Sequence, residues 1–231
     1  MRLFKRCLTA PLRIKTTRGF GVHSPFAFSF ITEVMRQKYQ YYAYPDEKMR
    51  RMALSRRSAV RRRPAPLKYQ HTVFRVVNRF SPSVILQLGQ SRGLETMAAL
   101  DTSSDLTIAE YSVKSQPDDY NRIISQADDR IVRHATFENA VSAWSAKSGE
   151  IPFAMVCGIA DDIKFRDVLK KALDDGGVVL FPNIDITPAA RRLWKSLNTS
   201  LRTHGMTFSN DRFGVIVGLR HLPRQTYMLY L

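Results

Sequence analysis

The stretch VILQLGQSRGLETMAAL, residues 84–100, decides the fold of this chain. Its first five residues, 84–88, are mostly apolar, and a short apolar run that ends at a glycine predicts a buried strand. Gly89 and Gly93 then predict a tight turn, because glycine adopts backbone conformations that other residues avoid. Residues 94–100 continue with helical spacing. A strand, a glycine turn and a helix in this order predict a sheet with helices packed on it.

The same alternation continues to residue 205. Strand-like runs at 106–110, 130–135, 153–158 and 178–182 alternate with helical stretches at 116–127, 138–147, 161–177 and 187–205. Repeated β-α units predict a mostly parallel sheet covered by helices on both faces, which is a doubly wound α/β domain. The last strand-like segments follow one another without helices, which indicates a C-terminal antiparallel hairpin. We therefore expect a basic, mainly helical N-terminal extension over residues 1–80 and an α/β domain over 81–231.

The net charge of +16 is concentrated at one end of the chain. Residues 1–80 contain 19 Lys and Arg against 3 Asp and Glu, whereas residues 81–231 contain 17 of each. The densest part is MRRMALSRRSAVRRRPAPLK, residues 49–68. Such a run attracts polyanions, which makes a nucleic acid or an anionic membrane surface a candidate partner. The alternative is a solvated basic helix followed by a linker.

Composition narrows the class of protein. The chain has two cysteines, Cys7 and Cys157, which give no disulfide framework. It contains no run of 18 apolar residues, so we predict no transmembrane helix. The N-terminus is interrupted by basic residues and lacks a secretory core. We therefore expect a cytoplasmic protein.

The glycine turn has two functional interpretations. As G-x-S-x-G it matches the nucleophile elbow of a serine hydrolase, and Asp185 with His204 or His221 would complete a triad in the right order. The context disfavours this interpretation. An elbow normally follows several strands of its sheet, whereas Ser91 follows the first strand, and no oxyanion segment precedes it.

The second interpretation is a cofactor loop. Gly89 and Gly93 allow a ligand to approach the backbone closely, and Glu110 closes the next strand 21 residues after Gly89. A spacing of about 20 residues is typical of carboxylates that accept hydrogen bonds from ribose hydroxyls. The loop lacks the middle glycine that clears space for a pyrophosphate, which favours a cofactor without phosphate. The alternative is that both glycines only shape the turn.

On these residues the chain resembles class I S-adenosylmethionine-dependent methyltransferases. ILQLGQSRG is similar to their first cofactor motif, and Glu110 to their ribose acid. More narrowly, the chain resembles bacterial O-methyltransferase-like proteins that carry a GVHSPF element, here residues 21–26. The resemblance implies a seven-stranded sheet, S-adenosylmethionine as cofactor and a small-molecule acceptor. The cofactor-binding residues that it implies are Gly89, Gln90, Ser91, Gly93, Glu110 and Thr136.

The chain departs from these proteins on the acceptor side. Cys157-Gly158-Ile159-Ala160 stands where they commonly carry an Asp-Gly with a polar partner, and Pro182-Asn183 stands where an Asp-Asp pair is usual. Hard divalent cations are held by carboxylate oxygens, so we predict no metal site and assign no catalytic residue. Three functions stay open: a small-molecule O-methyltransferase, a catalytically degenerate binding or scaffold protein of this fold, and an RNA methyltransferase that uses the basic extension.

Other polar residues near these positions have two interpretations each. Asp161 and Asp162 could supply a displaced carboxylate, but acids there are also typical of a helix start. His23 is a candidate for a polar residue over the pocket or for a structural turn residue. The remaining candidates, for which packing is the simpler role, are Cys157, His134 and the aromatic cluster 39–44.

Overall fold

A computed structural model describes residues 2–57, 67–149, 151–159 and 161–231. The central part of the Arg-rich stretch, residues 58–66, and Ala160 of the predicted acceptor side lie outside the described residues. The strands are β1 (Val84–Leu88), β2 (Thr107–Tyr111), β3 (Ile131–Arg133), β4 (Phe153–Val156), β5 (Val178–Phe181), β6 (Met206–Ser209), β7 (Gly214–Val217) and β8 (Gln225–Met228).

All of these strands form one sheet in the order β3-β2-β1-β4-β5-β7-β6-β8. Strands β1 to β5 are mutually parallel where they pair, and β7 is antiparallel to both β5 and β6. The predicted doubly wound α/β class and the antiparallel C-terminal hairpin are therefore confirmed. Strand order reverses between β1 and β4, since β2 and β3 lie on one side of β1 and the later strands on the other.

The predicted number of seven strands is wrong, because the described part of the chain has eight. Strand β8 pairs with β6 in parallel, with Met206 opposite Gln225. The backbone bond from Gly205 N to Leu222 O, at 2.9 Å, leads the chain from β7 back to the open edge of β6. An unpaired edge of β6 can accept another strand, and the C-terminal residues supply it.

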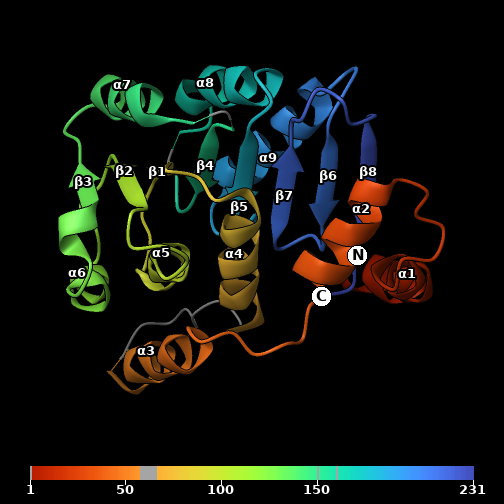
Figure 1. Ribbon diagram of the computed structural model, residues 1–231, viewed down its shortest axis with the longest axis horizontal. Helices are drawn as coiled ribbons and strands as arrows, with labels where there is room; N and C mark the ends of the chain where they lie inside the picture. Colours follow the sequence, from red (N-terminus) through yellow and green to blue (C-terminus); the bar gives the residue numbers. More distant parts are fainter. Residues whose placement is uncertain (1, 58–66, 150, 160) are drawn as a thin grey trace.

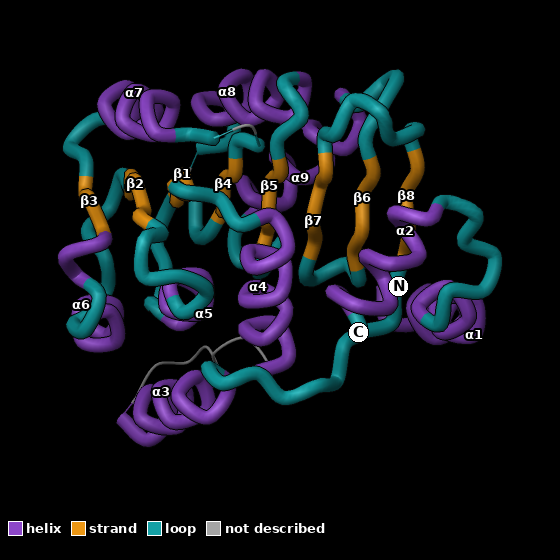
Figure 2. The backbone as a smooth tube through the Cα atoms, viewed as in Figure 1, coloured by secondary structure: helices purple, strands orange, loops and turns teal. Residues whose placement is uncertain are grey.

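The helices cover both faces of the sheet (Figure 1, Figure 2). One apolar core lies between the sheet and the helices η1 (Phe30–Met35), α4, α5 and α6. The second lies between the sheet and α7, α8 and α9. Helix bounds are α4 (Leu67–Phe80), α5 (Leu94–Leu100), α6 (Asp118–Ile124), α7 (Phe137–Lys147), α8 (Ile163–Asp174) and α9 (Pro188–Ser200), with a 3₁₀ turn, η2 (Asp128–Arg130), before β3.

The N-terminal residues form α1 (Arg2–Thr17), α2 (Pro25–Ser29), the π-helix η1 (Phe30–Met35) and α3 (Tyr44–Arg57). The GVHSPF element begins α2. Ser24 is its N-cap and accepts a hydrogen bond from Ala27 N, and Pro25 occupies the first turn, where no N–H is needed. The Phe30 ring then packs 4.7 Å from that of Phe208 in β6. Residues of the extension therefore share a core with the sheet.

A buried polar cluster fastens α3 to α4. Arg75 donates hydrogen bonds to Val34 O, to Met35 O and to the Tyr44 hydroxyl. Glu47 lies beside it, with its Oε2 atom 3.6 Å from His71 Nε2. Burial raises the pKa of Glu47 to about 8 and lowers the pKa of His71 to about 4, so both groups are neutral near pH 7.

None of the described helices combines the length and the apolar composition that crossing a bilayer requires.

Candidate functional site

The candidate site lies where the strand order reverses, at the carboxyl ends of β1, β2 and β4. In open α/β sheets this is the position at which ligands bind, because the loops that leave the strands diverge there. A cavity of about 300 Å³ opens at this point. Its walls come from the loops after β1, β2 and β4 and from the first turns of α8 and α9.

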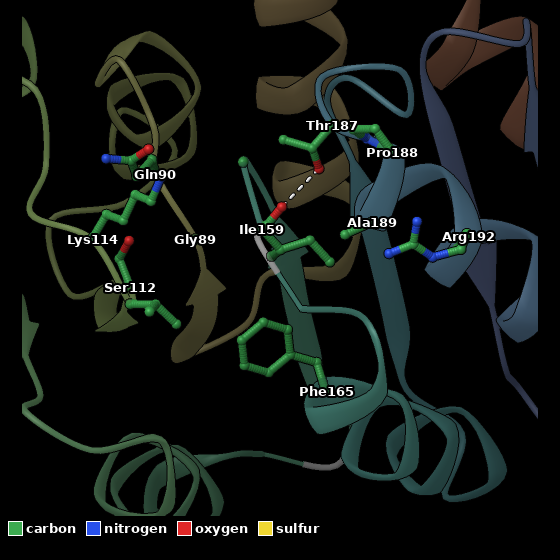
Figure 3. A pocket seen from close by; sticks show the side chains of 12 residues that line it. Gly89, Gln90, Ser112, Lys114, Ile159, Phe165, Thr187, Pro188, Ala189 and Arg192 are labelled. Atoms are coloured by element: carbon green, nitrogen blue, oxygen red, sulfur yellow. Dashed lines mark hydrogen bonds between the residues drawn. The ribbon is translucent and has the colours of Figure 1, made fainter.

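Two walls of the cavity face each other in Figure 3. Gln90, Ser112 and Lys114 form one wall, and residues 187–189 with Arg192 form the other. Phe165 lies at the base. The described lining residues include two cations, Lys114 and Arg192, and no acid.

The Thr187 hydroxyl holds the second wall in place. It donates to Ile159 O at 2.7 Å and accepts from Ala190 N at 3.1 Å. Thr187 is therefore both the N-cap of α9 and the tie between α9 and the loop after β4.

Gly89 joins the loops after β1 and β4. Its φ is +88°, and a Cβ atom there would lie 2.7 Å from the carbonyl carbon of Gly158. Directly beside it, Gln90 N donates to Gly158 O at 3.0 Å and Gly158 N donates to Gln90 O at 2.8 Å. Because Gly89 has no side chain, the backbone of Gly158 can pack directly against it. The sequence suggested that this space serves a ligand, but the protein's own backbone occupies it.

Gly93 has a similar internal role. It is the N-cap of α5 with φ +87°, and a Cβ there would lie 2.9 Å from the side chain of Ile123. Ser91 is buried between the two glycines. Its hydroxyl accepts from Gly93 N at 3.0 Å and lies 3.2 Å from Thr96 Oγ1.

The hydrolase interpretation of the same loop finds no assembled triad among the residues that the structure describes. Ser91 hydrogen-bonds Thr96, whereas Asp185 pairs with Arg191 at 2.7 Å. His204 Nδ1 lies 3.1 Å from the hydroxyl of Thr203, its neighbour in the chain. These contacts keep the three groups in separate local networks.

Glu110 lies at the carboxyl end of β2, beside the glycine loop, and is only 2% exposed. Tyr120 donates its hydroxyl proton to Glu110 Oε2 at 2.9 Å, and Gln87 donates to Oε1 at 3.4 Å. Arg133 adds an ion pair at 3.6 Å. Burial raises the pKa of Glu110, and these donors oppose that rise because they stabilise the carboxylate.

Gln116 occupies the space between Glu110 and the glycine loop. Its side-chain amide donates to Glu110 Oε1 and, at 3.3 Å, to Gly89 O. Its carbonyl oxygen accepts from Ser91 N at 2.9 Å. One amide therefore satisfies the carboxylate and two backbone groups of the loop.

The structure brings five of the six predicted cofactor residues together. Gly89 and Gln90 line the cavity, while Ser91, Gly93 and Glu110 lie behind the loop. Thr136 has a local role elsewhere. It is the N-cap of α7, accepts from Asn139 N at 3.2 Å, and is absent from the described cavity lining.

The polar residues of the predicted acceptor side are engaged in local contacts. Asp162 forms a bidentate pair with Arg192, whose shortest bond is 2.7 Å. Asp161 accepts from Ile163 N at 2.9 Å, as a residue at a helix start does. Asn183 accepts from Asp185 N at 3.1 Å. Within the described ranges, no group of three or more His, Cys, Asp or Glu residues could hold a metal ion.

The other polar candidates lie apart from the cavity or are inert. His23 is exposed and lines a separate hollow with His221. The Cys157 thiol is buried, and burial raises its pKa, which disfavours the reactive thiolate. Of the aromatic cluster, Tyr44 stacks on His71 at 3.6 Å, and Tyr39 is exposed.

Sequence reasoning missed Gln87, Gln116 and Tyr120. Gln87 carried a signal, because a lone amide in an apolar strand needs a buried partner. Tyr120 and Gln116 had none, because both lie in the segment after β2, and only the folded chain directs their polar atoms to Glu110.

Comparison with solved structures supports the fold. Cofactor-bound Rv0187 from MTB is 12% identical, with a TM-score of 0.51 over 74% of this chain and 89% of that one. SAH-bound PaMTH1, a Podospora anserina methyltransferase, is 14% identical, with a TM-score of 0.48 over 86% and 97%. The O-methyltransferase from Bacillus cereus in complex with SAH is 14% identical, with a TM-score of 0.46 over 81% and 94%.

At these identities the likeness concerns the fold alone, and of the three structures only the first has a TM-score above 0.5. No protein-family model matches the chain. No curated protein is similar to it in sequence.

Proposed function

We propose that this protein binds S-adenosylmethionine at the β1–β4 reversal and transfers its methyl group to the oxygen of a small molecule, without a metal ion. The observation that carries the proposal is the position of Glu110. A carboxylate at the end of β2 lies next to a glycine turn at the end of β1, beside a cavity at the strand-order reversal. We further propose a cytoplasmic location.

The residues fit the adenosine part of this cofactor after one change. The side chain of Gln116 has to move out of this position. Its movement frees Glu110 Oε1, Gly89 O and Ser91 N for hydrogen bonds to the ligand. Glu110 would then accept hydrogen bonds from the ribose hydroxyls in place of the amide of Gln116. When bound, S-adenosylmethionine supplies an electrophilic methyl group.

The cavity lining favours an acceptor that carries a negative charge. Lys114 is a cation, whereas the charge of Arg192 is balanced in part by Asp162. The described lining contains no carboxylate or histidine that could remove a proton. An acceptor oxygen that is already ionised in water needs no such base. Val113, which also lines the cavity and is 59% exposed, offers an apolar surface for the rest of the molecule. Positioning of the two reactants can supply much of the rate in such a displacement.

The hydrogen bonds of Gln116 also support a second candidate function. In this alternative the chain is a catalytically degenerate protein of this fold that serves as a binding or scaffold module. In that case the amide is a permanent substitute for the ligand and the site stays closed. A third candidate, an RNA methyltransferase, is supported by the charge of the N-terminal third alone.

Isothermal calorimetry with S-adenosylmethionine and S-adenosylhomocysteine separates the first two candidates. The proposal expects saturable heat for both ligands. A folded protein that gives no heat at millimolar ligand would leave the degenerate candidate. For the third, affinity for RNA should fall steeply with salt, and binding that is indifferent to salt removes it.

A further inference from the structure

Three large apolar side chains near the N-terminus face solvent. Leu12 is 69% exposed, Phe20 is 68% exposed and Phe28 is 48% exposed. They belong to α1, to the turn that follows it and to α2. Single exposed apolar residues are ordinary, but three within 17 residues of the chain form a group that needs an explanation. We call these three residues the N-terminal apolar patch.

The members of the patch lie near the C-terminal end of α1. Leu12 lies three residues, about one helical turn, before Lys15 in α1, which ends at Thr17. The Phe28 ring packs against Gly19, where a Cβ atom would overlap the ring. Phe20 follows directly, and its backbone N–H closes the helix end on Lys15 O at 3.1 Å. The turn therefore places Phe20 and Phe28 beside the C-terminal end of α1.

The surroundings of the patch are positively charged. Lys15 and Arg18 are exposed on the same segment. Residues 1–32 contain six Lys and Arg and no acid, and Glu33 is the first carboxylate of the chain. Exposed apolar groups beside Lys15 and Arg18 complement a surface that is apolar beneath and anionic above.

The opposite face of α1 is fixed to the α/β domain. Arg13 forms an ion pair with Asp211 at 2.7 Å, and Thr17 Oγ1 accepts from Tyr230 N at 2.8 Å. α1 and α2 therefore lie side by side at the β8 edge of the sheet, where Figure 1 and Figure 2 place them. This anchoring directs Leu12 and Lys15 away from the protein.

We infer that the N-terminal apolar patch docks on an anionic lipid surface, with α1 lying in the plane of the interface. Interfacial helices bind through an apolar side in the acyl boundary and through Lys and Arg against anionic headgroups. A second copy of the chain is disfavoured as the partner, since two proteins of charge +16 that meet at cation-rich faces repel. An RNA would leave the Leu12 side chain without an apolar partner.

The test is co-sedimentation of the full chain with vesicles of phosphatidylcholine alone and of phosphatidylcholine with phosphatidylglycerol in equal parts. We expect binding only to the anionic vesicles. The variant Lys15→Gln, Arg18→Gln should bind about 25-fold more weakly, because each charge near the surface contributes about fivefold. The variant Leu12→Ser, Phe20→Ser, Phe28→Ser should lose at least tenfold, because affinity scales with the buried apolar area.

Matched controls remove the same properties from other exposed positions. Ile163→Ser removes an apolar group of 68% exposure, and Lys195→Gln with Arg202→Gln removes two exposed charges. Both should bind as the wild type does, and circular dichroism shows whether every variant is folded.

Two results would overturn the inference. One is equal loss in the patch variants and their controls, which would show that the position of the substituted residues does not matter. The other is absence of vesicle binding together with binding of a mixed-sequence single-stranded RNA that depends on Lys15 and Arg18 but not on the apolar residues. As a second readout, Phe20→Trp should shift its emission to shorter wavelength on anionic vesicles, whereas Ile163→Trp should not.

Discussion

Replacing Gln116 with alanine should tighten the binding of S-adenosylhomocysteine. In the free protein the Gln116 amide bonds Glu110, Gly89 O and Ser91 N, and all three contacts must break before a ribose can reach the carboxylate. The alanine variant lacks these contacts, so its site is already open. A ligand that binds only the open state therefore binds the variant without the loss of affinity that the closed state causes in the wild type.

The structure sets the size of the effect. The contact with Gly89 O is long, at 3.3 Å, and contributes little, whereas the bond to the buried carboxylate is charge-assisted. A neutral bond contributes about 1 kcal/mol net and a charged one about 1.5–3 kcal/mol, but water recovers part of both when the amide is gone. We expect a net gain of about 2 kcal/mol in ligand binding, which is about 30-fold in Kd.

Calorimetry measures the change in ligand affinity, and thermal unfolding measures the change in stability of the free protein. Without ligand, Gln116→Ala should unfold at a lower temperature than the wild type, and saturating S-adenosylhomocysteine should narrow the difference. Gln126→Ala, which changes an exposed amide after α6, serves as the control and should alter neither quantity. A folded Gln116→Ala variant that binds no tighter than the wild type would refute the idea that this amide occupies the ligand position.

Two further predictions concern stability. Gly89→Ala should lower the free energy of unfolding by about 1–3 kcal/mol more than Gly176→Ala, because both residues have positive φ but only Gly89 lies against the backbone of Gly158. Urea unfolding of the two variants measures the difference, and equal losses would remove the proposed role of the loop contact. Stability should also fall as pH rises from 6.5 to 8. The folded-state pKa of Glu47, about 8, lies above its ordinary 4.5, so the folded protein holds a proton in this window that the unfolded chain releases. At 1.36 kcal/mol per unit the loss is about 2 kcal/mol at most, and Glu47→Gln should abolish it. Below pH 6.5 the depressed pKa of His71, about 4, acts in the opposite direction, so the wild-type curve should flatten between pH 4.5 and 6.5. A wild-type stability that rises between pH 6.5 and 8 would contradict this account of the cluster.

Most of the fold could be predicted because its signals are local. The strand at 84–88 and the helix at 94–100 have the predicted bounds, since an apolar run, a glycine turn and helical spacing all lie within 17 residues. The number of strands was wrong because the resemblance implied seven, although the strand-like C-terminal segments include residues 226–231, which overlap β8. The pairing of β8 depends on the open edge of β6, which no pattern within residues 225–228 reveals.

The sequence predicted the position of the candidate site, but not that the side chain of Gln116 occupies it. Glycines and a carboxylate at a fixed spacing locate Gly89 and Glu110 beside each other, because parallel strands β1 and β2 end at the same edge. The side chains that contact Gly89 and Glu110 belong to residues outside any recognisable sequence motif. Gln116 follows Glu110 by only six positions, yet its bonds to both Glu110 and the glycine loop require the loop after β2 to fold back. Such a turn has no sequence signature here.

The most direct test of the central claim is a calorimetric cycle with two proteins and two ligands. Wild type and Glu110→Gln are each titrated with S-adenosylhomocysteine and with its 2′,3′-dideoxyribose analogue. If Glu110 holds the ribose, the substitution should weaken the first ligand at least tenfold, since a charge-assisted bond is lost, and should leave the second nearly unchanged. An equal loss for both ligands, or no loss for either in a folded variant, would contradict the assignment of Glu110 as the ribose acid.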